Sequence, residues 1–368
     1  MQVGIFGTPS PLTYWTVHAI RIAAQVLYPN YSFIQAVRLD DLDSYRNLIE
    51  DRAHENVVLF SDCPDSKICD LIGSIGTPVL FVADEPEDIL SFVVTSRDMR
   101  IEYALRFLSQ SISALSVLFA GENFREIRNH HYSGSVRDYI RSIINFFNFT
   151  FTEEQLEQIF FQLFANYEPG ADTRVGDQIM RHFAQARWPH RYDVLNAEAR
   201  DLADRVGAQY GSILRNERYE QIVWPREVFS DWDRPGQFVR GPQAMLGPAR
   251  FLICGPYLHL PRGLWDARVE IEVDNNLSGN EIRSDVLCGV EVVTGITARL
   301  PNRGVFAFDM TFRVSEPLLP VEIRIEMLRG AVEGCFMFRG AKLKRVGSGM
   351  PEGRAVEEIV VPPSFVDG

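Results

Sequence analysis

The sequence predicts two successive fold classes: an α/β domain with a parallel sheet and a helical annex, followed by an all-β antiparallel sandwich. In the first part, short β-branched runs alternate with segments whose apolar residues recur with a period near 3.6. A stretch rich in glycine and proline follows Trp224-Pro225, and beyond it apolar and polar residues alternate with a period of two. At 368 residues, the chain is long enough for two hydrophobic cores.

The first part reads as strands and helices in alternation, which favours right-handed crossovers between parallel strands. The predicted strands are short, apolar and bounded by Gly, Pro or Asp, as buried parallel strands are; they are Val3–Phe6, Val57–Phe60 and Val79–Val82. The predicted helices are Tyr14–Leu27, Ile101–Phe119, Val136–Phe149 and one or two within Met180–Arg215, interrupted around Trp188-Pro189.

The second part contains long runs with strict alternation, which indicates strands with one buried face. Ala267–Val273, Val305–Val314 and Val321–Met327 each place apolar residues at every second position. Turn residues separate them, as in Leu300–Gly304, so the pattern predicts a sandwich of about 100 residues. The domains expected are an α/β domain over 1–222, a linker over 223–246, the sandwich over 247–346 and an extended tail over 347–368.

Composition excludes several classes of function. The formal net charge of −12 disfavours nucleic acid and anionic membranes as partners. The five cysteines are scattered without a Cys-x-x-Cys pair, so we expect reduced thiols and neither a zinc site nor another metal site. No signal-peptide pattern and no apolar run of membrane-spanning length is present. The expected location is the cytoplasm, or a particle or surface reached without a signal peptide.

The first loop has the position of a phosphate-binding site but lacks the usual residues. Gly7-Thr8-Pro9 joins the first strand to the first helix, where α/β proteins bind phosphates through helix N-terminal N–H groups. The loop has no Lys, no Arg and no glycine after Gly7, and Pro9 and Pro11 have no N–H to donate. The architecture is that of an anion site without the donors.

This loop resembles that of the sulfotransferases, which reads Pro-(Lys/Arg)-Ser-Gly-Thr-Thr-Trp after Gly-Thr. The matching residues are Gly7, Thr8, Pro9, Thr13 and Trp15, while Ser10 stands where the family has the basic residue that binds the sulfuryl donor. In the similar segment Thr77–Ser91, Asp84 and Glu87 occupy the positions of two arginines, one of which binds the donor's 3′-phosphate. The likeness covers roughly the first 165 to 220 residues and implies a P-loop-like fold.

The magnitude of the missing interactions argues against an ordinary active sulfotransferase. Each charge-assisted bond to a phosphate contributes about 1.5–3 kcal/mol, so two losses weaken donor binding by several orders of magnitude. We therefore expect a pseudoenzyme with no cofactor, in which Gly7, Thr8, Pro9, Ser10 and Thr13 form only a degenerate loop. The alternative is a divergent transferase that takes its phosphate contacts from elsewhere, such as Arg97 or Arg100.

The sandwich has a likeness of its own. Gly255–Ile271, with Gly-Pro-Tyr followed by Pro-Arg-Gly-Leu-Trp, resembles jelly rolls of the carbohydrate-binding-module type that are attached to bacterial glycan-modifying proteins. Arg339–Arg345 is similar to the closing strand of such modules. The likeness covers roughly residues 245 to 346 and implies recognition of a glycan.

Sugar binding needs an exposed aromatic face and planar amides or carboxylates for the hydroxyls. The candidate platforms are Tyr257, His259 and Trp265, and the candidate polar partners are Asp274, Asn275, Asn276 and Asn280. The competing interpretation is that Trp265 packs under the sandwich and that 274–276 is an ordinary loop after a strand.

Two hypotheses for function follow. The first is a non-catalytic glycan-binding or structural protein at a bacterial surface polysaccharide, working as an oligomer in a multi-copy assembly with other proteins. The second is a sulfotransferase or glycosyl-group transferase that modifies a polysaccharide. An open, electropositive pocket above Gly7–Thr13 would favour the enzyme, and a pocket filled by Leu12, Tyr14 and Phe92 would favour the binding protein.

Overall fold

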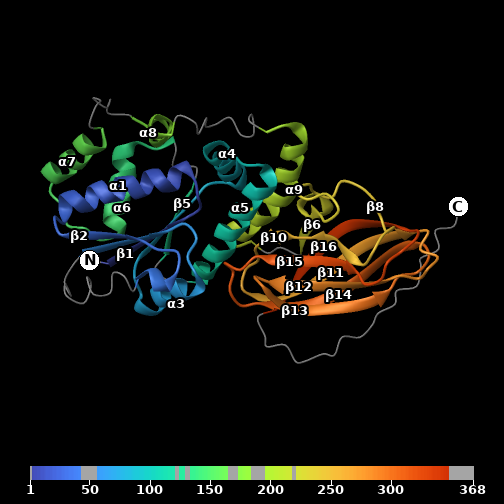
Figure 1. The fold of residues 1–368 in the computed structure, drawn as a ribbon. Helices are drawn as coiled ribbons and strands as arrows, with labels where there is room; N and C mark the ends of the chain where they lie inside the picture. Colours follow the sequence, from blue (N-terminus) through green and yellow to red (C-terminus); the bar gives the residue numbers. More distant parts are fainter. Residues whose placement is uncertain are drawn as a thin grey trace. The chain divides into compact units, whose positions relative to one another are not determined.

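A computed structural model describes residues 2–42, 56–120, 124–128, 133–164, 173–183, 195–217 and 221–347. The chain divides into two compact units, Met1–Asn216 and Glu217–Gly368, which are described in turn (Figure 1).

The first unit contains a five-stranded sheet whose pairings are all parallel, in the order β2-β3-β1-β4-β5. The strands are β1 (Gln2–Gly7), β2 (Tyr31–Gln35), β3 (Asn56–Ser61), β4 (Val79–Ala83) and β5 (Phe124–Arg128). The three central strands are those that the sequence predicts, and the two edge strands are additional. The predicted parallel α/β fold is therefore confirmed.

Helices follow most strands and form the annex (Figure 1). They are α1 (Pro11–Leu27), α3 (Ser66–Ile75), α4 (Pro86–Arg97), α5 (Ile101–Leu115), α6 (Val136–Phe146), α7 (Glu153–Leu163), α8 (Val175–His182) and α9 (Ala197–Leu214). A 3₁₀ turn, Ser116–Ala120, continues α5, so the predicted single helix over 101–119 changes its pitch at Ser116. Helix α7 begins with a capping box between Thr152 and Gln155.

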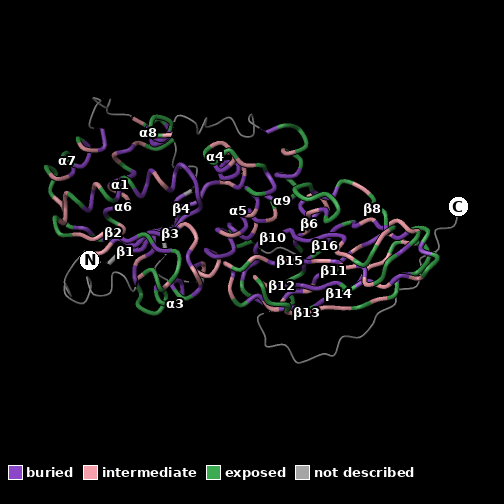
Figure 2. The backbone as a smooth tube through the Cα atoms, viewed as in Figure 1, coloured by how far each residue is buried: buried purple, intermediate pink, exposed green. Residues whose placement is uncertain are grey.

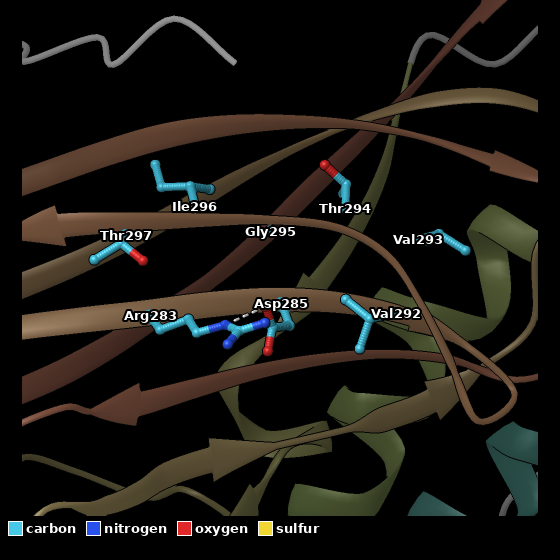
Figure 3. Close-up of a pocket in the computed structure, with 8 residues that line it drawn as sticks. All are labelled: Arg283, Asp285, Val292, Val293, Thr294, Gly295, Ile296 and Thr297. Carbon is cyan, nitrogen blue, oxygen red and sulfur yellow. Dashed lines mark hydrogen bonds and ion pairs between the residues drawn. The ribbon is translucent and has the colours of Figure 1, made fainter. Parts of the chain in front are cut away.

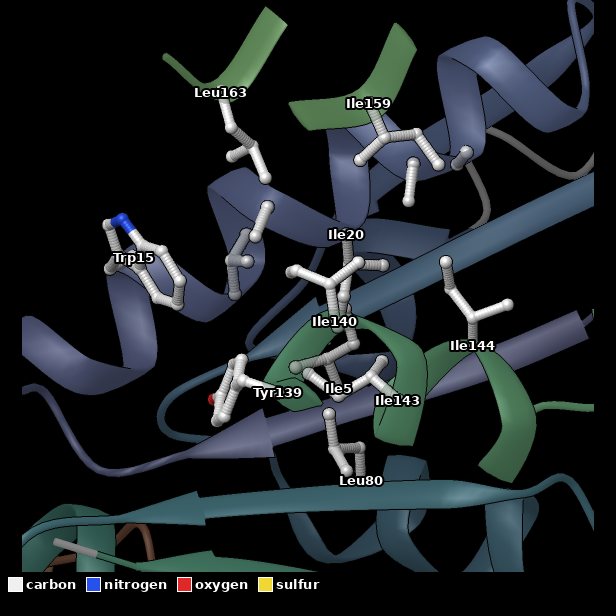
Figure 4. Close-up of a cluster of buried hydrophobic side chains, with 14 of the residues drawn as sticks. Ile5, Trp15, Ile20, Leu80, Tyr139, Ile140, Ile143, Ile144, Ile159 and Leu163 are labelled. Atoms are coloured by element: carbon white, nitrogen blue, oxygen red, sulfur yellow. The ribbon is translucent and has the colours of Figure 1, made fainter. Parts of the chain in front are cut away.

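The core of the first unit lies between the sheet and helices α1, α6 and α7. Figure 4 shows Ile5 and Leu80 from the sheet facing Ile20 of α1 and Ile140 of α6, all of them buried. Trp15 of α1 is 1% exposed and its ring lies 5.5 Å from that of Tyr139. Packing of Trp15 in this core holds the N-terminal part of α1 close to the end of β1, which the helix follows along the chain.

The second unit is built from two antiparallel sheets. One has the order β13-β12-β15-β9-β7 with β10 paired to β15, and the other has the order β14-β11-β16-β6 with β8 paired to β16. The strands are β6 (Ile222–Pro225), β7 (Ser230–Asp231), β8 (Gln243–Ala244), β9 (Arg250–Cys254), β10 (Pro256–Leu258), β11 (Gly263–Asp274), β12 (Glu281–Cys288), β13 (Glu291–Arg299), β14 (Gly304–Val314), β15 (Val321–Met327) and β16 (Cys335–Gly347).

Burial along these strands follows the alternation of the sequence. In β15, Val321, Ile323, Ile325 and Met327 are buried and the residues between them are half-buried. Phe308 and Phe312 of β14 are also buried, and the tube of Figure 2 changes between buried and less buried residues along the long strands. The predicted antiparallel sandwich is confirmed.

Several details differ from the sequence-based expectation. Helix α1 begins at Pro11 rather than Tyr14, because proline at the first helical position loses no hydrogen bond there. The segment 223–246, expected as a linker, contains most of β6 and all of β7 and β8, which pair with β16 and β9. The interruption at Trp188-Pro189 and nearly all of the tail expected over 347–368 lie outside the described residues.

Among the described residues, no helix has both the length and the apolar character needed to cross a membrane.

Candidate functional site

Three N–H groups at the first βα turn donate hydrogen bonds within the chain. The N–H of Thr8 donates to the carbonyl of Val82 (3.0 Å), and the N–H of Thr13 donates to the side-chain oxygen of Ser10 (3.3 Å). The N–H of Tyr14 donates to the carbonyl of Ser10 (3.1 Å), as in an ordinary helix. Ser10 thus acts as the N-cap of α1, and these three N–H groups are occupied within the chain.

Packing closes the same turn sterically. A Cβ added at Gly7 would lie 2.6 Å from the carbonyl oxygen of Val82 and 2.7 Å from Cγ2 of Thr13, so this position requires glycine. The side chain of Thr13 also donates to the Val82 carbonyl (3.2 Å). Thr8, Ser10 and Thr13 are all 0% exposed. Gly7 therefore serves a close approach between β1, β4 and α1.

Aromatic side chains pack around Tyr14, in the first turn of α1. The ring of Tyr14 lies 6.3 Å from that of Phe60 and 6.0 Å from that of Phe92, whose ring in turn lies 5.9 Å from that of Phe183. The Tyr14 hydroxyl donates to Asp62 (2.8 Å), and burial together with the Asp62 charge raises the pKa of Tyr14. The side chains Tyr14 and Phe92 thus occupy this region, and Leu12, at 0% exposure, lies in the core.

Electrostatics at the turn are also unfavourable for an anion. Asp84 follows β4 at the position where the sulfotransferase-like pattern has arginine, and it is 1% exposed. Of the two substitute cations, Arg97 lies over the ring of Phe107, 4.4 Å from its centre. Arg100 forms an ion pair with Glu102 at 3.2 Å. A carboxylate therefore stands next to the turn, and both arginines make contacts within the chain.

Four of the predicted sugar-binding residues lie inside the second unit. Trp265 is 0% exposed and donates from its indole N–H to the carbonyl of Pro261 (3.0 Å). His259, 5% exposed, contacts the Pro317 carbonyl through Nδ1 (2.9 Å). Asn276 donates to the Leu300 carbonyl (3.0 Å), and its side-chain oxygen accepts from the N–H of Asn280 (3.1 Å). These residues organise loops and core, as the competing interpretation has it.

The other three predicted residues are reachable from solvent but are not brought together. Tyr257 of β10 is half-buried and donates to Glu322 (3.3 Å). Asp274 and Asn275 are exposed at the end of β11, in the other sheet, and Asp274 pairs with Arg303 (3.2 Å). The structure therefore places the candidates on two different sheets.

The structure brings together a different set of side chains on the outer face of the six-stranded sheet. The ring of Trp232 lies 4.9 Å from that of Phe251, and the guanidinium of Arg324 lies over Phe251, 5.4 Å from the ring centre. Arg324 Nε lies 3.5 Å from Asp285 Oδ2, and Arg283 Nε donates to Asp285 Oδ1 at 2.9 Å. We call these five side chains the cross-strand row, because they run from the end of β7 over β9 and β15 to β12.

The row ends in an open hollow of about 290 Å³ at the edge strand β13 (Figure 3). Arg283 and Asp285 line it on β12, and the lining on β13 is Val292, Val293, Thr294, Gly295, Ile296 and Thr297. In Figure 3 the guanidinium of Arg283 lies beside the carboxylate of Asp285. The hollow is thus lined by one ion pair and by aliphatic and hydroxyl side chains.

The outer face of the second unit's other sheet, which contains β14, β11, β16, β6 and β8, has a different character. Ion pairs join its neighbouring strands: Arg268 with Asp309 (3.1 Å), Lys342 with Glu270 (2.7 Å) and Arg339 with Glu272 (3.6 Å). Such a ladder is typical of a solvated sheet surface, where opposite charges on adjacent strands pair. The aromatic and charged row therefore distinguishes the six-stranded sheet as the candidate binding face.

Within the described ranges, no group of three or more His, Cys, Asp and Glu side chains is placed to hold a metal ion. The adjacent His130 and His131 lie outside those ranges.

Comparison with known proteins gives likenesses of fold at low identity. No protein-family model and no curated protein matches the sequence. Among solved structures, the chain is similar to the mouse sulfotransferase SULT7A1 complexed with PAP, with 10% identity over 58% of this chain and 88% of that chain and a TM-score of 0.38. It is also similar to TmCBM61 in complex with β-1,4-galactotriose, with 11% identity over 34% of this chain and 88% of that chain and a TM-score of 0.23.

A further similar structure is a carbohydrate-binding module from Cellvibrio mixtus lichenase 5A in complex with cellotriose. The identity is 12%, the alignment covers 35% of this chain and 99% of the module, and the TM-score is 0.22. At such similarity the ligand or activity of these proteins does not transfer to the chain, since one fold hosts many functions.

Proposed function

We propose that the second unit binds a glycan through the cross-strand row. Trp232 is 48% exposed, and its ring packs at a tilt against that of Phe251, 4.9 Å away. An indole held in this way offers an apolar face to the CH-rich side of a sugar ring. The guanidiniums of Arg283 and Arg324 supply donors, and the hydroxyls of Thr294 and Thr297 at the hollow supply acceptors, a combination that suits sugar hydroxyl groups, which both donate and accept.

The extent of the row fits an oligosaccharide rather than a single sugar. The sheet order β7-β9-β15-β12-β13 places four strand-to-strand steps between Trp232 and the hollow at β13. Neighbouring strands are separated by about 4.8 Å, so the row spans roughly 19 Å. A sugar chain lying across the strands would contact the tryptophan and the ion pairs together.

We further propose that the first unit is a non-catalytic scaffold. The support is the closed turn, in which the N–H groups of Thr8, Thr13 and Tyr14 are used internally and Asp84 lies next to the turn. A transferase would have to open this turn and lose its internal bonds before a phosphate could approach. The chain as a whole then acts as a glycan-binding or structural component.

The setting that we propose is a bacterial surface polysaccharide, bound by several copies of the chain in an assembly. A shallow sheet face makes few bonds, and each of them replaces a bond to water, so the affinity of one site is low. Several copies on one polymer raise the working affinity by orders of magnitude without a new contact. Oligomerisation therefore belongs to this proposal.

The proposal is tested with the full-length protein on an array of bacterial and plant polysaccharides. Trp232→Ala should abolish binding and leave the melting temperature nearly unchanged, because the side chain is about half exposed. The matched control is Phe161→Ala, which removes a 77% exposed aromatic residue from the first unit and should leave binding intact.

Two results would overturn this assignment. If Trp232→Ala binds as well as the parent while Tyr257→Ala does not, the glycan lies at β10 and not along the row. If the folded parent protein binds no glycan on the array, the sandwich is better explained as a docking domain for a protein.

A further inference from the structure

Asp285 occupies an unusual position for an acidic residue. It lies on the outer face of the six-stranded sheet, yet it is only 3% exposed. Arg283 Nε and Arg324 Nε approach its two carboxylate oxygens at 2.9 and 3.5 Å. Burying a carboxylate with its cations has a desolvation cost that the ion pairs often only offset, so stability alone does not explain this arrangement.

The neighbouring strand is built to admit this carboxylate. Gly295 of β13 stands directly opposite Asp285 in the antiparallel register. A Cβ added at Gly295 would overlap Oδ1 of Asp285 and lie 3.2 Å from the carbonyl oxygen of Ser284. Glycine inside a strand weakens the strand, and one use of such a glycine is to let another group approach closely. The register thus links Gly295 to the position of the Asp285 carboxylate.

From this geometry we propose that Asp285 is a positioning residue that determines which arrangement of sugar hydroxyls the row accepts; this rests on the glycan-binding function proposed above. Its carboxylate accepts a hydrogen bond from Arg283 Nε (2.9 Å) and forms a longer ion pair with Arg324 (3.5 Å), whose guanidinium also lies over the ring of Phe251. The remaining N–H donors of the two guanidiniums then form two forks, one on each side of Asp285, whose positions this carboxylate sets.

Two forks of N–H donors at set positions distinguish between epimers, which are sugars that differ in the orientation of one hydroxyl. A sugar whose hydroxyls face both forks satisfies the donors, whereas an epimer with one hydroxyl inverted leaves a donor without its partner. Sites built on hydrogen bonds reject such analogues strongly, because the unmatched polar group has already lost its water. Without Asp285 the arginine side chains would adopt several rotamers, and selectivity would fall along with affinity.

The test uses the full-length protein and three probes, the β-1,4-linked tetrasaccharides of glucose, mannose and galactose. The glucose and mannose probes differ in the free hydroxyl at C2, and the galactose probe differs from the glucose probe in the bridging oxygen at C4 and so in the shape of the chain. Affinities are measured by titration calorimetry for the parent, Gly295→Ala and Asp285→Asn. The matched control is Gly241→Ala, since a Cβ added at Gly241 meets nothing within 4 Å. Melting curves show whether each variant is folded.

We expect the parent to prefer one probe. Gly295→Ala, which displaces the carboxylate without changing any charge, should lose about tenfold to a hundredfold in affinity for that probe, as for a lost charge-assisted bond. The ratio of affinities between the probes should move towards one. Asp285→Asn should show the same loss of selectivity, and it decides the question if Gly295→Ala does not fold. Gly241→Ala should behave as the parent.

The outcomes separate the two proposals. A parent that binds all three probes equally, or variants that keep the parent's affinity ratio, would overturn the role of Asp285 and leave the glycan-binding function standing. A folded parent that binds none of the three counts against the glycan-binding function itself.

Discussion

Trp232 and Trp265 show how two residues of the same type serve different purposes in one unit. Trp265 is 0% exposed and hydrogen-bonded to Pro261, whereas Trp232 is 48% exposed and packs at a tilt against Phe251. We predict that Trp265→Ala lowers the free energy of unfolding of the second unit by about 3–5 kcal/mol, because it leaves a cavity in the core. Urea unfolding followed by fluorescence measures the change, and a decrease below about 1 kcal/mol would contradict the core assignment.

Phe308 tests the register of β14. It is 8% exposed and lies among the buried residues that alternate along this strand. We predict that Phe308→Asp destabilises the second unit by several kcal/mol, since an unpaired charge would be buried. The control is Val290→Asp, the same change of charge at a side chain that is 98% exposed. Equal melting temperatures for Phe308→Asp and the parent would mean that this face of β14 is not the inner one.

His18 of α1 is expected to make the stability of the first unit depend on pH. Its ring lies 5.2 Å from that of His182 of α8, and partial burial, His182 and Arg21 lower the pKa of His18 below its usual value of 6.5. At His18 the unfolded chain therefore binds a proton more readily than the folded chain. The stability of the first unit thus falls as the pH drops through 6.5 towards the lower pKa of the folded state.

We predict that His18→Gln reduces the loss of stability of the first unit between pH 7.5 and pH 5.5. The measurement is the difference in melting temperature between the parent and the variant at both pH values. An identical pH dependence in the two proteins would rule out His18 as a contributor.

At the scale of elements, the long regular strands and the central parallel strands could be predicted because their burial alternates or is continuous. The edge strands β2 and β5 could not, since half-buried residues such as Tyr31 and Phe33 give no clear period. Strands β6 to β8 are two to four residues long, too short for any periodicity to identify them. They are strands because they pair with longer ones, β6 and β8 with β16 and β7 with β9.

The cross-strand row could not be predicted for the same physical reason. Trp232, Phe251, Asp285 and Arg324 lie far apart in the sequence and meet only through strand order and register. Trp232 stands in a Trp-Asp-Arg-Pro-Gly segment that is typical of a turn, so the sequence gives no sign that its side chain lies beside the sheet. The pairing of Gly295 with Asp285 was the available signal, but it becomes visible only once the register is known.

The closed first turn of α1 leads to a prediction about ligand binding. The N–H groups of Thr8, Thr13 and Tyr14 are used internally, and Asp84 is buried next to the turn. We therefore predict that adenosine 3′,5′-bisphosphate, the spent sulfuryl donor, binds with a dissociation constant above about 1 mM, weaker than −4.1 kcal/mol. Titration calorimetry is the measurement, and micromolar affinity would make the transferase the better hypothesis.

At the scale of the whole molecule, the division at Asn216 and Glu217 bears on which fragment binds glycan. A fragment over 245–346 matches the carbohydrate-binding-module likeness but lacks β6 to β8 and Trp232. We predict that a fragment over 217–368 folds and binds the same glycans as the full chain, whereas 245–346 does neither, because it loses three paired strands. Circular dichroism and the glycan array measure both properties, and binding by the shorter fragment would exclude Trp232 from the site.

The internal bonding of the first turn also has an evolutionary consequence. A single change of Ser10 to lysine would remove the N-cap, costing about 1 kcal/mol, and would place a cation at a position that is 0% exposed. The change would free the N–H of Thr13, but the N–H groups of Thr8 and Tyr14 would still be bonded to the backbone carbonyls of Val82 and residue 10, so an anion would gain few donors. Several simultaneous substitutions would be needed before the turn could bind a phosphate. The turn is therefore separated from a phosphate-binding loop by several substitutions that would each destabilise it when made alone.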